Sequence, residues 1–131
     1  MQGAMARAAS VYQQTHVQSR SPVELVSMLY DGLLRFLGEG RDAIGRGDLV
    51  TKREKISRAL AIIAELQNTL NMQEGGEIAT SLDALYTYVN GQLLDANMHH
   101  TTAGIEDAIK VLTPLREAWA QLASQPPVTQ P

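Results

Sequence analysis

Residues 21–45, SPVELVSMLYDGLLRFLGEGRDAIG, decide the fold, because they combine a complete helix start with a very wide apolar face. Ser21 offers a capping hydroxyl, and Glu24 occupies the reciprocal position of a capping box. Pro22 stands in the first turn, where its missing N–H leaves no hydrogen bond unmade. The sequence therefore predicts a firm helix start at Ser21.

The sequence also predicts where this helix ends. Gly45 and Gly47 flank Arg46, and glycine ends helices at little cost because it tolerates left-handed backbone. We expect the helix to run to about Ile44. Asp48 follows at once and has the right chemistry to cap a second helix.

The apolar face of the first helix is wider than a simple bundle needs. Apolar side chains cover an arc of about 240°, whereas a core-facing stripe needs little more than ~100°. They are Leu25, Val26, Met28, Leu29, Tyr30, Leu33, Leu34, Phe36 and Leu37. Two interpretations stay open here: the helix is central to an irregular bundle, or it offers a second apolar face to another molecule.

Three further segments repeat apolar residues at three- and four-residue steps, the spacing of one helical face. The second helix carries Ile56, Ala59, Leu60, Ile63, Leu66 and Leu70, the third Ile78, Leu82, Leu85, Tyr86, Val89, Leu93 and Ala96, and the fourth Ile105, Ala108, Ile109, Leu112, Leu115, Trp119 and Leu122. Breaks are expected at 71–76 and 99–102, and Pro114 is expected to bend the fourth helix.

These helices and their short connections predict an all-α fold, an elongated antiparallel four-helix bundle. The bundle domain is expected over residues 21–123. Residues 1–20 lack a sustained apolar period and predict a mobile N-terminal arm that contains Tyr12. Residues 124–131 contain three prolines and predict a disordered tail.

Charge is distributed unevenly, although the net charge is only -3. No Lys or Arg occurs between Arg58 and Lys110, so that half is acidic and would repel phosphate backbones. The pattern disfavours a nucleic-acid partner. No apolar run approaches the roughly 18 residues of a membrane span, and we expect a cytoplasmic protein without membrane insertion.

The residue types that carry catalysis form no recognisable set. The chain has no cysteine, and its histidines, His16, His99 and His100, fall in expected connections or the arm. No Glu is followed by His at the spacing of a di-iron bundle. We expect no enzyme activity, no metal and no cofactor; a degenerate phosphotransfer bundle is the alternative from the enzyme class.

Several blocks of the sequence resemble the flagellin export chaperone family, commonly called FliS. They are YQQ at 12–14, SPVEL at 21–25, MLYDG at 28–32, GGEIA at 75–79 and the Leu115, Ala118 and Trp119 pattern. Together they cover about residues 12–122. One departure is NGQ at 90–92, where family members usually carry basic residues.

The resemblance implies a cytosolic chaperone that binds the disordered C-terminal segment of flagellin in apolar grooves. It would prevent premature polymerisation and aid delivery to the flagellar export apparatus, with an export gate component as a further partner. Expected groove residues are Leu29, Leu33, Leu66, Ile78, Leu82 and Tyr86, with Tyr12 on the arm that competes for the groove. The alternative is a regulatory protein that sequesters another flagellar partner, such as a regulator.

Overall fold

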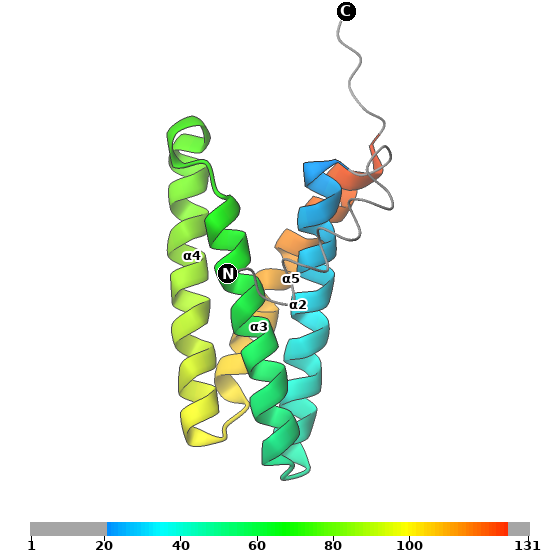
Figure 1. Cartoon of the computed structure of the whole chain (residues 1–131), viewed down its shortest axis with the longest axis vertical. Coiled ribbons are helices and arrows are strands. Elements are labelled where there is room, and N and C mark those ends of the chain that lie inside the picture. Colours follow the sequence, from blue (N-terminus) through cyan, green and yellow to red (C-terminus); the bar gives the residue numbers. More distant parts are fainter. Residues whose placement is uncertain (1–20, 126–131) are drawn as a thin grey trace, which may run out of the picture.

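The computed structural model describes residues 21–125, which fold into four helices. They are α2 (Pro22–Gly45), α3 (Leu49–Thr69), α4 (Met72–His99) and α5 (Ala103–Ser124). Successive helices run in opposite directions along one long axis (Figure 1). The prediction of an all-α antiparallel bundle is confirmed. The expected arm at 1–20 and the tail residues 126–131 lie outside the described part of the chain.

Local side-chain hydrogen bonds set the first two helix starts where the sequence placed them. The Glu24 backbone N–H donates to Ser21 Oγ at 3.1 Å, and the Ser21 N–H donates to Glu24 Oε1 at 2.9 Å. Asp48 Oδ1 accepts from the Thr51 N–H at 3.1 Å. Each bond satisfies a backbone donor that the first turn of a helix leaves free.

The third helix differs from its prediction at both ends. It was expected to begin after a break at 71–76, but α4 starts at Met72 and is interrupted only at Gly76, where φ is 53° and ψ is -129°. One helical turn thus precedes the break, because the Asn71 side chain accepts from the Glu74 N–H. At the other end α4 includes His99, because His100 adopts the left-handed φ of 56° that ends the helix. The α5 helix continues through Pro114.

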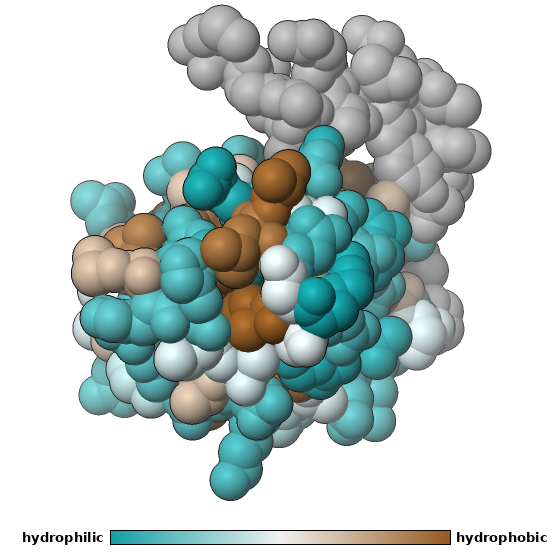
Figure 2. All heavy atoms as spheres, turned by 90° about the horizontal axis from the view of Figure 1, so that it is seen from below, coloured by the Kyte–Doolittle hydropathy of each residue, from teal (hydrophilic) through white to brown (hydrophobic). Residues whose placement is uncertain are grey.

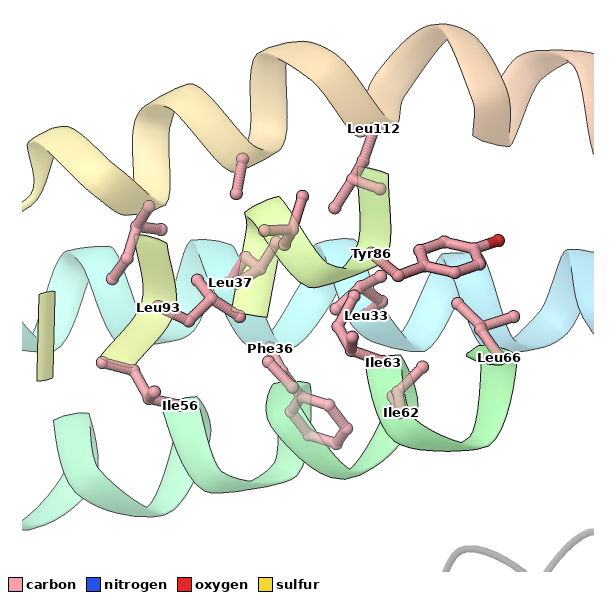
Figure 3. Packing of buried hydrophobic residues seen from close by; sticks show 14 of the residues in the cluster. Leu33, Phe36, Leu37, Ile56, Ile62, Ile63, Leu66, Tyr86, Leu93 and Leu112 are labelled. Carbon is pink, nitrogen blue, oxygen red and sulfur yellow. The ribbon is translucent and has the colours of Figure 1, made fainter. Parts of the chain in front are cut away.

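The core lies at the centre of the bundle, with α2 diagonally opposite α4 and α3 diagonally opposite α5. The α2 helix packs against α3 and α5, and α4 packs against the same two neighbours. Leucines at the centre, including Leu33, Leu37, Leu93 and Leu112, are completely buried (Figure 3). This arrangement places α2 and α4 opposite each other across the core. No helix among residues 21–125 is long and apolar enough to cross a membrane.

Candidate binding cleft

An apolar cleft of about 570 Å³ opens at the end of the bundle where α2 begins and α3 ends. All four helices contribute to its walls. Apolar lining residues are Pro22, Leu25, Val26, Met28, Leu29, Leu66, Leu70, Ile78, Ala79, Leu82, Tyr86 and Trp119, joined by Gly75, Glu65, Thr69 and Asn71. We call this space the main cleft.

The main cleft exists because the apolar face of α2 extends beyond the closed core. Leu33 and Leu37 are fully buried, but Met28, nearer the start of the same helix, is 37% exposed. Across the cleft Ile78 on α4 is 74% exposed. The apolar side chains at this end are therefore left partly open to solvent, so helices α3, α4 and α5 do not cover the whole apolar arc of α2.

The opposite end of the bundle is closed. There Ala43 and Ile105 are fully buried. Seen from this end, the surface is mainly hydrophilic, with a band of hydrophobic residues across its middle and a smaller group at the left (Figure 2). Exposed apolar side chains such as Val50, at 77%, also occur near this end, and scattered apolar residues of this kind are ordinary on protein surfaces.

Aromatic residues form the floor of the main cleft. The Tyr86 side chain is directed toward the end where α2 begins (Figure 3). Its hydroxyl lies 2.6 Å from that of Tyr30, and the Tyr30 ring is 6.4 Å from the Trp119 ring. Burial raises the pKa of both tyrosines, and for Tyr30 the hydrogen bond to Tyr86 raises it further. Tyrosine is neutral at physiological pH, and the raised pKa favours the neutral form further, so the Tyr86 side chain at the floor carries no charge.

The structure brings most of the predicted site residues to this one cleft. Leu29, Leu66, Ile78, Leu82 and Tyr86 all line it. Leu33 does not: it is fully buried in the core, because it lies one turn of α2 below Leu29, where all four helices have closed. Tyr12 lies outside the described residues.

Trp119 was expected on the apolar face of the fourth helix and was not predicted as a cleft residue. It is only partly buried and lines the main cleft from α5. Its helical spacing was visible, but spacing alone does not tell a core position from a wall. Leu25, Val26 and Met28 were visible in the wide arc of α2, although none was singled out.

The cleft offers apolar contact rather than chemistry. Among residues 21–125, Glu65 is the only lining residue that carries a charge at neutral pH. No group of three or more His, Asp or Glu side chains among residues 21–125 is arranged to hold a metal ion. A cavity of this kind suits apolar side chains that a partner presents at helical spacing.

Fold and cleft together define a class, an all-helical bundle with an open apolar cleft of the type that holds peptide segments. Comparison with known proteins gives the family. The pattern of the family described as "Flagellar protein FliS" matches residues 4–126. The chain belongs to the FliS family of flagellar secretion chaperones, and the predicted resemblance is confirmed.

Three relatives illustrate the similarity, each described as "Flagellar secretion chaperone FliS". The protein of Salmonella typhimurium is 39% identical over 116 residues, which is 88% of this chain and 86% of the relative. That of Campylobacter jejuni is 36% identical over 123 residues, 94% and 96% of the two chains. That of Bacillus subtilis is 36% identical over 112 residues, 86% and 83% of the two chains. The role of this chain is accordingly in flagellar export.

Proposed function

We propose that this chain is a cytoplasmic export chaperone that binds the disordered C-terminal segment of flagellin in the main cleft. Binding keeps flagellin from polymerising before export and carries it to the export apparatus. The observation that supports this most directly is the open apolar lining shared by all four helices. A flagellar secretion chaperone must hold an unfolded client, and this surface has the chemistry to do so.

Apolar burial is the driving force of the proposed complex. Removing apolar surface from water contributes roughly 25 cal/mol per Å², less the cost of ordering the bound segment. Met28 and Ile78 stand exposed on opposite walls. A segment that presents apolar side chains at helical spacing would cover both and shield them from water.

Isothermal titration calorimetry with the flagellin C-terminal peptide tests the proposal. We expect 1:1 binding with a negative heat-capacity change. The variant Ile78→Asp should lower the affinity at least roughly tenfold, since burying an isoleucine contributes about 1.5–3 kcal/mol. Ile78 is 74% exposed, so the substitution leaves the core untouched.

A matched control is available at the other end of the bundle. Val50 is 77% exposed and lies in the first turn of α3, outside the main cleft. Val50→Asp makes the same kind of change and should leave the affinity within about twofold, as expected of a surface change outside the site. No heat of binding with the intact chain would reject the proposal. Equal losses in both variants would place the contact elsewhere than in the main cleft.

A further inference from the structure

A second hollow lies beside the main cleft, along α2 and α3. Its volume is about 450 Å³, and it is lined by Met28, Leu29, Asp31, Gly32, Arg35, Phe36 and Ile62. We call it the side groove. Met28 and Leu29 line both spaces, so the two hollows adjoin at these side chains. From Met28 to Phe36 the side groove follows α2 for about two turns, or ~12 Å.

The middle of the side groove is open because Gly32 has no side chain. A Cβ at this position would meet Ile62 Cδ1 at 3.4 Å, an ordinary contact, so alanine would fit. Glycine inside a helix is less stable than alanine, because it has more freedom to lose on folding. Gly32 thus leaves open a space that a side chain larger than alanine would fill.

Positive charge gathers at the far end of the side groove, around the Phe36 ring. The charged groups of Arg35, Lys55 and Arg58 lie 4.8, 5.6 and 5.8 Å from the ring centroid. Figure 3 shows Phe36 beside α3, away from the central leucines.

Two of these three cations already have acidic partners. Lys55 Nζ is 3.3 Å from Glu39 Oε1, and Arg58 is 3.6 Å from Glu54 Oε2. Arg35 forms no ion pair with any residue in the range 21–125. At the near end of the groove the Asp31 carboxylate is 2.7 Å from Arg116 and so is also paired. One exposed positive charge therefore remains, beside an apolar groove.

We infer that the side groove receives a further stretch of the bound segment, one with an apolar side chain over Gly32 and a carboxylate at Arg35. This inference rests on the proposed function and adds the chemistry of the client: an apolar segment that carries an acidic residue about two helical turns from the side chains in the main cleft. The side chains of the two segments that flank the described residues offer no carboxylate. Neither residues 1–20 nor residues 126–131 contain Asp or Glu.

Titration of the full chain with the flagellin peptide tests the charge. Arg35→Gln should weaken binding about threefold at low salt, the size expected for one exposed ion pair, and the difference should shrink at high salt. Arg53→Gln is the matched control, because Arg53 is exposed on α3 and outside both hollows. Its affinity should stay within about 1.5-fold of the parent chain, as for a distant surface charge.

The peptide supplies the other half of the test. Changing each Asp or Glu of the peptide to its amide, one at a time, should reveal one position that weakens binding to the parent chain but not to Arg35→Gln. This non-additivity identifies the acidic residue of the peptide that pairs with Arg35. If every acidic position is additive with Arg35→Gln, the inference fails while the proposed function stands. If the parent chain binds no peptide at all, both fail.

Filling the side groove with a larger side chain tests the inference independently. Gly32→Met should weaken binding about fivefold or more by occupying the space a side chain of the client needs, whereas Gly32→Ala should change the affinity little. Thermal melting of both variants checks that they fold. A Gly32→Met chain that binds as well as Gly32→Ala would overturn the inference. So would sedimentation showing that Arg35→Gln alters self-association, since the occupant would then be a second copy of the chain.

Discussion

The hydroxyl groups of Tyr30 and Tyr86 lie 2.6 Å apart and connect α2 to α4 across the diagonal of the bundle. Both side chains are almost completely inaccessible to solvent. A buried hydroxyl without a partner costs free energy, so each tyrosine depends on the other. The pair stands at the boundary where the closed core ends and the main cleft begins.

Replacing one member of this pair should cost stability. Tyr30→Phe leaves the Tyr86 hydroxyl buried without its partner, and we expect the free energy of unfolding to fall by about 1–3 kcal/mol. Urea denaturation measures the change. The double variant Tyr30→Phe, Tyr86→Phe is the control, because it removes both hydroxyls and leaves neither of them without its partner; it should lose less than the sum of the two single variants. Strictly additive losses would mean that the diagonal hydrogen bond contributes little.

The same pair predicts a loss of stability at alkaline pH. Burial raises the folded-state pKa of Tyr30 and Tyr86 above the ordinary tyrosine value, so the folded state favours the protonated form. The two tyrosines therefore contribute a constant amount below about pH 10, the pKa of an unfolded chain. Above that pH only the unfolded state releases these protons, and the free energy of unfolding decreases as pH rises.

The double variant Tyr30→Phe, Tyr86→Phe isolates this contribution from other groups that titrate in the alkaline range. Its free energy of unfolding, measured by urea denaturation between pH 8 and 11, should fall less steeply above about pH 10 than that of the parent chain. Parallel pH profiles for the two proteins would contradict a raised pKa for the buried tyrosines.

The cap of α2 supports a second stability prediction. Ser21→Ala removes the hydroxyl that accepts from the Glu24 N–H, and we expect a loss of about 1 kcal/mol. Ser57 is exposed and lies inside α3, so Ser57→Ala is a suitable control. It should be neutral or slightly stabilising, because alanine is the better helix former. Thermal melting distinguishes the two, and an unchanged midpoint for Ser21→Ala would show that the cap is dispensable.

Features that depend on residues close together in the sequence could be predicted, whereas features that depend on the packing of all four helices could not. Helix starts at Ser21 and Asp48 were predictable, since each cap involves residues three positions apart. The main cleft was only half predictable. Leu29 and Leu33 lie on the same apolar face of α2, and the neighbouring sequence does not show which of them is buried in the core. That depends on whether α4 and α5 close over each position, which is a property of the whole bundle. Trp119 was not predicted to line the cleft because its position, too, depends on how the four helices pack.

Two glycines of α4, Gly76 near its start and Gly91 farther along, support opposite stability predictions. Gly76 has a φ of 53°, which L-residues seldom adopt, and Gly76→Ala should lower the free energy of unfolding by about 1–3 kcal/mol. Gly91, inside the same helix, has nothing within 4 Å of its missing Cβ. Gly91→Ala should therefore stabilise the chain by about 0.5–1 kcal/mol. Urea denaturation compares the two, and a change of the same sign in both would remove any special role for the break at Gly76.

The last prediction concerns Lys52, which joins α3 to the end of α4. Its side chain is 1% exposed, and its ammonium donates to Asn97 O and Oδ1, both at 2.9 Å, and contacts His100 Nδ1 at 3.0 Å. Burial lowers the pKa of Lys52, and the nearby positive charge of Arg53 lowers it further. Holding the ammonium here therefore has a desolvation cost, which the acceptors at the C-terminal end of α4 offset.

Lys52→Met keeps the length of the side chain and removes its charge. Hydrogen bonds to a charged group contribute about 1.5–3 kcal/mol each, and methionine cannot satisfy the oxygens of Asn97. We expect the lost bonds to outweigh the relieved desolvation, with a net loss of about 1–2 kcal/mol. Urea denaturation should show this loss for Lys52→Met but not for the exposed control Lys110→Met. A more stable Lys52→Met would mean that desolvation of the ammonium outweighs its hydrogen bonds.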